Sequence, residues 1–525
     1  MPKIKVTYTT LAVDDPEMDA QFDRAIEHVN GLRGRTFPML INGKEVHAAE
    51  KLPIISPIDV REPLVYFQKG TREDARAAIA AARAAFPAWS RTPYEERCRY
   101  LDQVADRISE TAFELSAMMM LEMGKNRVEA LGEVAETADL LRYYADQMRQ
   151  NNGYVRQMAS FGDTDTNLSL LKPYGVWAVI SPFNFPLALA AAPVAAALVT
   201  GNTVVLKPSS DAPWTNYEVV RYYLELGLPA GVLNFITGPG SSAGAELIDN
   251  AHVDGITFTG SYEIGFKQVY QNFARHYPKP IVVEMGGKNP TIISEKADLE
   301  KAALGVMRSA FGLNGQKCSA CSRVYVHEQV FDAFMAVLLE KTRTLKIGNP
   351  LEKGTFMGPV ANKSGFEDYQ RFMQKARASA TVVYGGNVLD SGEMAYGYFV
   401  EPAIITDLPE DHELVKTELF VPILFVTKVK TLDEAMQKAN DTFYGLTAGF
   451  YSEDQDEVRW FMDNIQAGVV YANRPGGATT GAWPGYQTFG GWKGSGSSGR
   501  NIGGLYSLFN YVREQSQTVI RGGLG

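Results

Sequence analysis

The chain has 525 residues, enough for about three domains of ordinary size. Hydrophobic residues make up 45% of it and charged residues 21%, which is ordinary globular usage and excludes a largely disordered chain. The net charge of -9 argues against a nucleic-acid partner, which needs a basic surface. Three cysteines exclude a disulfide framework and favour the cytoplasm or another reducing compartment.

The N-terminal part of the chain is predicted to be mostly helical. A helix is predicted over 17–30, and Asn42-Gly43 is typical of a hairpin turn. Ala-rich sequence and apolar positions at helical spacing then predict helices over 72–86 and 94–122.

From residue 175 the pattern changes to short apolar strands that alternate with helices. This alternation predicts a parallel sheet covered by helices, with strands at 175–180, 203–207, 232–237 and 255–259. A second α/β run follows over 280–468, with strands predicted at 281–284, 322–327, 381–384 and 424–429. The uncharged stretch 173–206 is interrupted by prolines, so no membrane span is expected.

The segment Gly315-Gln316-Lys317-Cys318 carries the sharpest chemical signal. A cysteine in a short polar turn between a helix and a strand is placed to act as a nucleophile through its thiolate. A zinc site shared with Cys321 is a weak alternative, since no second Cys or His pair stands at ligand spacing. The six scattered histidines offer no base for a cysteine hydrolase. Cys98 and Cys321 are expected to be buried structural residues.

Two further segments supply candidate partners for this nucleophile. Glu284 ends a predicted strand just before two glycines, where it can act as a general base for water or form an ion pair with Lys288. Asn184 lies in an apolar loop, where its amide can donate to an oxyanion or simply stabilise the loop.

Three strand ends are candidates for binding a phosphate or a ribose. Gly260-Ser261 precedes a predicted helix, so the serine can hold a phosphate or serve as a plain helix cap. The turn around Gly240 is a second Gly-rich connection from a strand to a helix. Lys207 and Ser210 can present a cation and a hydroxyl to a ribose, or form a solvated strand end.

In this order and spacing, the motifs resemble the aldehyde dehydrogenase superfamily over about residues 40–520. The motifs that carry the resemblance are Pro-Phe-Asn184-Phe-Pro, Lys207-Pro, Phe-Thr-Gly-Ser261, Glu284-Met-Gly-Gly-Lys, Gly-Gln-Lys-Cys318, Glu418-Leu-Phe420 and Phe489-Gly-Gly. Cys318 follows Glu284 by 34 residues, as in that family.

The resemblance implies an α/β, aldehyde dehydrogenase-like fold of three parts. They are a Rossmann-type cofactor domain with an N-terminal extension (1–150 and 174–283), an α/β catalytic domain (284–500) and a small β oligomerisation domain (151–173 and 505–525). A homo-oligomer is expected, either a dimer or an assembly of dimers. In it, a C-terminal strand at 515–520 is expected to pair with a partner subunit's hairpin within 154–172.

The resemblance also implies a reaction that uses NAD. Cys318 would attack an aldehyde, and the Asn184 amide with the Cys318 backbone N–H would hold the oxyanion. Hydride transfer would leave a thioester, which water activated by Glu284 would hydrolyse. NADP is also compatible, since Ser210 stands where many NAD-specific members have Glu. No metal is implied, and the implied cofactor contacts are Lys207, Ser210, Gly240, Gly260, Ser261, Glu418 and Phe420.

Within the superfamily, residues 315–323 and the N-terminal extension look like the 1-pyrroline-5-carboxylate dehydrogenases. This likeness implies oxidation of L-glutamate γ-semialdehyde to L-glutamate in proline degradation. The alternatives are a dehydrogenase of another short semialdehyde and a catalytically silent binding protein on the same fold. Glu284 argues against an acyl-CoA-forming enzyme, which needs no hydrolytic base. The implied substrate contacts are Glu136, Phe185, Ser319, Gly481, Ala482 and Phe489.

Overall fold

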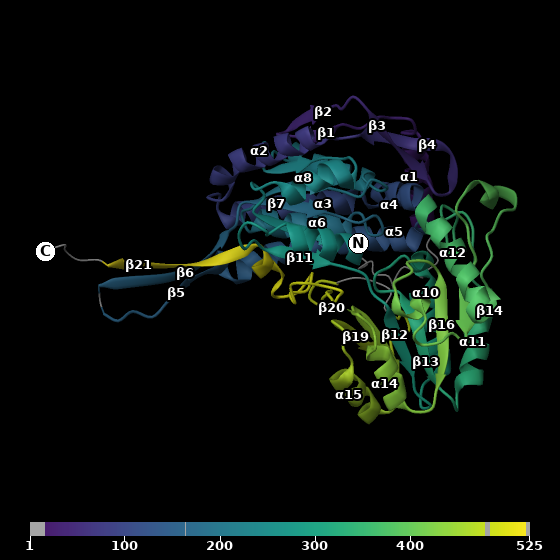
Figure 1. Cartoon of the computed structure of the whole chain (residues 1–525). Coiled ribbons are helices and arrows are strands. Elements are labelled where there is room, and N and C mark those ends of the chain that lie inside the picture. Colours follow the sequence, from purple (N-terminus) through teal and green to yellow (C-terminus); the bar gives the residue numbers. More distant parts are fainter. Residues whose placement is uncertain (1–15, 163, 478–482, 521–525) are drawn as a thin grey trace.

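The computed structural model describes residues 16–162, 164–477 and 483–520, and two seven-stranded sheets form its body. Figure 1 shows the first sheet and its helices in the upper part of the molecule, the second sheet at the lower right, and a narrow arm of strands that projects to the left. No helix in the described ranges is long and apolar enough to cross a membrane.

The first sheet has the strand order β11-β10-β7-β8-β9-β1-β2. Its parallel strands are β7 (Val176–Ile180), β8 (Thr203–Lys207), β9 (Leu233–Phe235), β10 (Gly255–Thr259) and β11 (Ile281–Glu284). The hairpin of β1 (Met39–Ile41) and β2 (Lys44–Val46) confirms the predicted turn, with positive φ at Asn42 and Gly43. The assignment of residues 281–284 to the second α/β run is wrong, because β11 pairs in parallel with β10 along its whole length.

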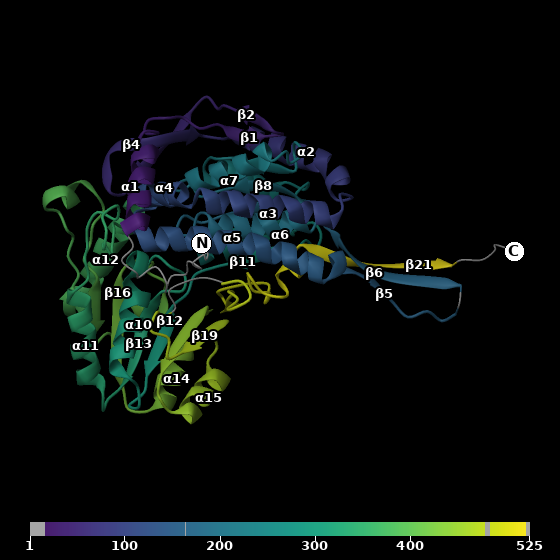
Figure 2. The ribbon, with the colours of Figure 1, turned by 180° about the vertical axis from the view of Figure 1, so that it is seen from behind.

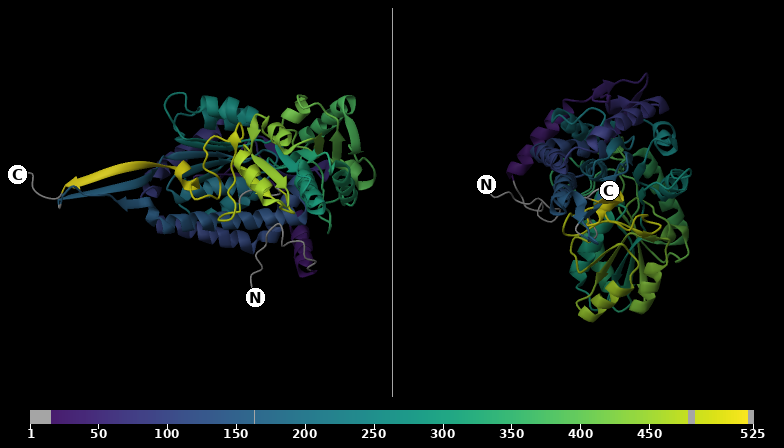
Figure 3. Two further views of the ribbon diagram at one scale, coloured as in Figure 1. Left: turned by 90° about the horizontal axis from the view of Figure 1, so that it is seen from below. Right: turned by 90° about the vertical axis from the view of Figure 1, so that its left-hand side faces the viewer.

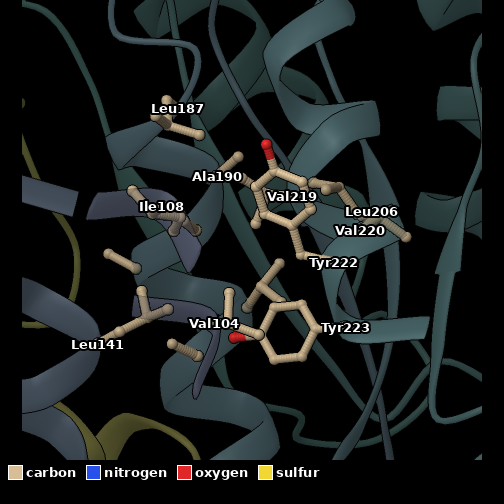
Figure 4. Close-up of a cluster of buried hydrophobic side chains, with 14 of the residues drawn as sticks. Val104, Ile108, Leu141, Leu187, Ala190, Leu206, Val219, Val220, Tyr222 and Tyr223 are labelled. Carbon is tan, nitrogen blue, oxygen red and sulfur yellow. The ribbon is translucent and has the colours of Figure 1, made fainter. Parts of the chain in front are cut away.

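Helices cover both faces of the first sheet (Figure 2). They are α2 (Arg72–Trp89), α3 (Tyr94–Glu110), α4 (Ala112–Met123), α5 (Arg127–Gln150), α6 (Ala188–Val199), α7 (Trp214–Glu225) and α8 (Ala245–Asp249). The helix predicted over 94–122 is two helices, because Thr111 leaves the helical conformation at φ -104 and ψ 25. The main apolar cluster lies among these helices, and Figure 4 shows Val104 and Ile108 of α3 beside Leu141 of α5 and Tyr222 of α7.

The second sheet has the strand order β14-β15-β16-β13-β12-β18-β19. Its strands are β12 (Asn289–Ile293), β13 (Cys321–His327), β14 (Thr381–Gly385), β15 (Ala403–Thr406), β16 (Ile423–Val429), β18 (Thr447–Tyr451) and β19 (Val469–Ala472). β14 runs antiparallel to β15, and the other neighbouring pairs are parallel. The helices of this part are α10 (Leu299–Phe311), α11 (Phe331–Arg343), α12 (Lys363–Ser379), α14 (Leu432–Asn440) and α15 (Gln455–Asn464).

The body contains further helices and strands outside the two main groups. They are α1 (Pro16–Asn30), β3 (Lys51–Ser56), β4 (Asp59–Gln68), α9 (Tyr262–Ile264), α13 (Glu413–Lys416), β17 (Tyr444–Gly445) and β20 (Trp492–Lys493).

The projecting arm is a three-stranded antiparallel sheet of β5 (Val155–Gln157), β6 (Asp165–Pro173) and β21 (Val512–Ile520), and Figure 3 shows it standing clear of the body. The predicted C-terminal strand is confirmed, but the prediction that it pairs with a partner subunit's hairpin is wrong, since β21 pairs with β6 of its own chain. The Tyr511 ring lies 4.6 Å from the Trp177 ring. The Tyr511 carbonyl accepts a hydrogen bond from Asn202. These contacts hold Tyr511 in place, so that β21 begins next to the last residue of β6.

Candidate active site

The predicted residues of the first sheet gather at one edge of it, because each lies at the carboxyl end of a parallel strand. Asn184 follows β7, Lys207 ends β8, Gly240 follows β9, Gly260 and Ser261 follow β10, and Glu284 ends β11. In the strand order, β8 and β9 continue on one side of β7, while β10 and β11 lie on the other. Open parallel sheets bind ligands in the crevice at such a change of direction.

The second sheet presents the amino ends of its strands to the same place. Cys318 and Ser319 lie just before β13, and Glu418 and Phe420 lie just before β16. The backbone N–H of Gly287, in the loop after β11, donates to the Glu418 carboxylate at 2.9 Å. The two sheets therefore meet at the predicted site.

Cys318 opens onto a small cavity that most of the predicted substrate residues share. Its lining comprises Glu136, Leu140, Phe185, Ala188, Leu189, Cys318, Ser319, Phe489 and Ile502. Gly481 and Ala482 lie outside the described residues. The sequence did not predict Leu140, Ala188, Leu189 and Ile502 as lining residues. Leu140 and Leu189 follow Glu136 and Phe185 by one helical turn, so the spacing i, i+4 was an available signal; Ile502 carries no local signal.

The thiol of Cys318 is placed for reaction at this cavity. Burial and the nearby Glu418 and Glu284 carboxylates raise its pKa above the usual range. Cys98 and Cys321 are buried free thiols, as expected, and Cys321 Sγ lies 3.2 Å from the Thr291 hydroxyl. No group of His, Cys, Asp or Glu among the described residues could hold a metal ion, so the zinc alternative has no support.

Asn184 is held against the turn that carries the nucleophile. Its buried side-chain amide donates to the Gln316 carbonyl at 2.9 Å. The Gln316 side chain in turn accepts from the backbone N–H of Ala361 at 3.0 Å. An amide nitrogen carries two hydrogens, so Asn184 retains one donor for a ligand near Cys318.

Glu284 is a buried carboxyl group, only 5% exposed. One of its carboxyl oxygens has no hydrogen-bond partner in the described structure. Burial raises its pKa to about 8. The alternative of an ion pair with Lys288 is wrong, since the buried Lys288 amine has no hydrogen-bonding partner among the described residues and lies 4.9 Å from the Phe425 ring centre.

Lys207 and Ser210 lie beside the Gly-rich turn that follows β9. The buried Lys207 amine donates to the Pro208 carbonyl at 2.9 Å, so the solvated alternative is wrong for it. Burial lowers the pKa of this amine to about 8. Ser210 donates to the Gly238 carbonyl at 3.2 Å, and a Cβ on Gly244 would lie 3.6 Å from the Lys207 side chain.

Ser261 is the N-cap of α9. Its hydroxyl accepts a weak hydrogen bond from the Ile264 backbone at 3.4 Å, as the plain-cap alternative predicts. Gly260 packs tightly, because a Cβ there would lie 2.7 Å from the Phe258 ring.

Glu418 occupies the space that a side chain at position 286 would need. A Cβ on Gly286 would lie 2.0 Å from a Glu418 carboxyl oxygen, so a side chain there would displace the Glu418 carboxylate. Burial raises the pKa of Glu418 to about 7. Phe420, at φ 59, places its ring 5.7 Å from the Phe183 ring in an edge-on contact. Glu418 and Phe420, the first and last residues of the predicted Glu-Leu-Phe motif, therefore both lie at the crevice.

Comparison with known proteins agrees with this arrangement. Residues 45–516 match the Aldehyde dehydrogenase family. The chain is 37% identical to 1-pyrroline-5-carboxylate dehydrogenase of Anoxybacillus flavithermus over 86% of this chain and 88% of that protein. It is also 37% identical to alpha-ketoglutaric semialdehyde dehydrogenase of Bacillus subtilis, over 83% of this chain and 90% of that one.

A solved structure of 1-pyrroline-5-carboxylate dehydrogenase from Thermus with bound NAD superimposes with a TM-score of 0.92. Its sequence is 33% identical, and the match covers 97% of this chain and 98% of that one. The family match spans the second sheet, the parallel strands of the first sheet and every catalytic motif described above. This chain therefore belongs to the aldehyde dehydrogenase family.

Proposed function

We propose that this protein oxidises L-glutamate γ-semialdehyde, the open form of 1-pyrroline-5-carboxylate, to L-glutamate in proline degradation. The observation that carries the proposal is the cavity in which Glu136, Phe185, Ser319 and Phe489 surround Cys318. The similarity to the Anoxybacillus flavithermus and Thermus enzymes supports the same substrate.

The cavity suits a short chain with polar groups at its far end. Phe185 and Phe489 provide apolar walls for the methylene groups of the substrate. Glu136, which is 3% exposed, offers a carboxylate for the α-ammonium group, and the Ser319 hydroxyl offers a donor for the α-carboxylate. The Bacillus subtilis relative supports another semialdehyde as the second candidate.

The site also fits a nicotinamide dinucleotide. Gly240 faces open space, since a Cβ there would meet no atom within 4 Å, so the turn leaves room for a ligand to approach its backbone. Lys207 and Ser210 would hold a ribose, Gly260 and Ser261 the phosphates, and Glu418 and Phe420 the nicotinamide end. When bound, NAD accepts a hydride from the carbon attached to Cys318, and the small Ser210 is compatible with NADP as well.

The residues of the chain divide the reaction between them. Cys318 gives up its thiol proton to water and adds as the thiolate to the aldehyde carbonyl, and the Asn184 amide with the Cys318 backbone N–H stabilises the oxyanion of the thiohemiacetal. After oxidation, Glu284 takes a proton from the water that attacks the thioester. The product acid leaves and the Cys318 thiol is restored.

The rate of thioester hydrolysis is expected to rise about tenfold between pH 7 and pH 9. A general base works in its ionised form, and burial places the pKa of Glu284 at about 8. The ionised fraction therefore grows from about a tenth to about nine tenths over this range. Stopped-flow measurement of the hydrolysis step checks this, and a rate that falls as the pH rises would contradict it.

Simple alkyl aldehydes are expected to be poor substrates. A site that hydrogen-bonds polar groups rejects analogues that lack them, because its own buried groups are then left unpaired. We expect kcat/KM for hexanal to be at least ~100-fold below that for pyrroline-5-carboxylate. Ser319→Ala is expected to narrow this difference, because it should lower kcat/KM for pyrroline-5-carboxylate and leave kcat/KM for hexanal unchanged.

Initial rates with both aldehydes, for the native protein and for Ser319→Ala, check this prediction. Thr344→Ala, which removes a surface hydroxyl at the end of α11, is the matched control and is expected to change neither rate. Equal efficiency with hexanal and pyrroline-5-carboxylate would reject the proposed substrate and leave the family assignment intact.

Assembly and location complete the proposal. The proposed division is a cofactor domain (1–150 and 174–283), a catalytic domain (284–500) and an oligomerisation domain (151–173 and 505–525), and the presence of two sheets and an arm supports it. The arm exposes the apolar side chains of Val155, Met158, Phe161, Val519 and Ile520, which supports a homo-oligomer built through it. Three free thiols support a reducing compartment such as the cytoplasm.

A further inference from the structure

A second cavity of about 380 Å³ adjoins the turn that carries the nucleophile, and the reaction described above does not use it. The start of α5, the end of α10 and the segment around Phe356 enclose it. Lys317 lines this cavity, and the next two residues, Cys318 and Ser319, line the catalytic cavity. A single turn of the chain therefore borders both.

The lining of the second cavity includes a cationic side chain that has no partner among the described residues. Arg308, on α10, is half-buried, and no described residue forms an ion pair or side-chain hydrogen bond with its guanidinium group. Arg127, which lines the same cavity, is instead paired with Asp19 and with Asp23 at 2.6 Å. A guanidinium group offers a planar fork of donors that matches a carboxylate.

A buried ion pair lies where the cavity meets the Cys318 turn. Lys317 Nζ lies 2.8 Å from the Glu129 carboxylate, and the two side chains are 4% and 13% exposed. A Cβ on Gly312 would lie 2.8 Å from Lys317 Nζ and 3.1 Å from Glu129. Because residue 312 is a glycine, there is room for the Lys317–Glu129 ion pair. The charges of Lys317 and Glu129 cancel on this side of the cavity. Glu352, which also lines the cavity, is paired with Lys346 at 2.9 Å. Among the described lining residues, Arg308 is then the cation available to an anion.

We propose that the second cavity is an outer subsite for aldehydes that carry a carboxylate, in which Arg308 binds the carboxylate before the aldehyde reaches Cys318. The inference rests on the proposed function only in that the substrate is a carboxylated aldehyde. A cation at the mouth of a site raises the rate of association of an anion, and the effect falls with ionic strength. The chemical step at Cys318 is not changed by it.

The test compares Arg308→Gln with the native protein on pyrroline-5-carboxylate, succinate semialdehyde and hexanal. Removing the charge is expected to lower kcat/KM for both carboxylated aldehydes about fivefold and to weaken its dependence on salt. We expect kcat, and all values for hexanal, to stay unchanged. Arg308→Lys, which keeps the charge, is expected to restore most of the loss.

Arg343→Gln is the matched control, since it removes the same charge at the exposed end of α11. Arg343→Gln is expected to leave kcat/KM for all three substrates unchanged. An equal loss with hexanal would mean that Arg308 only supports the structure, and an unchanged kcat/KM for both carboxylated aldehydes would overturn the subsite. A third outcome is that the native protein fails to oxidise pyrroline-5-carboxylate while Arg308→Gln lowers kcat/KM for succinate semialdehyde. In that case the proposed function is wrong and the proposed subsite is supported.

Discussion

Replacing Cys318 with alanine is expected to lower aldehyde oxidation by about 10⁴-fold or more, because no other group can form the covalent adduct. The Cys318 side chain only packs against the edge of a small apolar cluster, so the fold is expected to survive its loss. Binding of NAD is expected to be unchanged, because the residues proposed to hold it lie on other segments. Spectrophotometric rates together with cofactor titration measure both effects.

Cys321→Ala is the matched control for the nucleophile. Its thiol lies in the core of the second sheet, against Thr291, and it does not line the catalytic cavity. We expect the Cys321→Ala protein to keep its rate of turnover and its free energy of unfolding to fall by about 1 kcal/mol. Substantial turnover by Cys318→Ala, or its loss in a folded Cys321→Ala protein, would contradict the assignment.

Replacing Glu284 with glutamine is expected to stop the reaction after one turnover. The amide keeps the shape of the side chain but cannot accept a proton, so the thioester forms and is not hydrolysed. We expect a burst of reduced cofactor close to one per active site, followed by a steady rate about 10³-fold below that of the native protein. Rapid-mixing absorbance measurements separate the two phases.

Glu340→Gln, an isosteric change on the exposed face of α11, is the control for the loss of a carboxylate. It is expected to behave as the native protein. If Glu284→Gln shows an unchanged steady rate, another group activates the water. If it shows no burst, Glu284 acts before hydride transfer, and the proposed division of labour is wrong.

Much of the first sheet was predictable because its strands are short, apolar and followed by Gly or Pro turns. The second sheet was harder to predict. β12 begins with Asn289-Pro290, a pair typical of turns, and β15, β18 and β19 are also short strands without a distinctive pattern. Pairing with neighbours far away in the sequence, which local patterns do not encode, fixes them as strands.

The site was predictable where one continuous motif carries the chemistry, as for Cys318 and Glu284. It was not predictable where helices bring distant charges together. Lys125 lies 3.8 Å from the centre of the Phe185 ring and is paired with Glu133. Glu133 also accepts hydrogen bonds from the backbone of Leu187 and Ala188. Charged residues on a helix usually face solvent, so the local sequence does not indicate that Lys125 and Glu133 are buried next to Phe185 and the start of α6.

The pairing of β21 with β6 also sets an order of events during synthesis. β6 ends at Pro173 and β21 begins at Val512, so all the residues between these two strands are translated before the arm can be completed. Until then one edge of β6 is unpaired, and an open strand edge is a site for unwanted association. Assembly through the finished arm therefore has to wait for β21, and chains that stop before Val512 leave that edge of β6 unpaired.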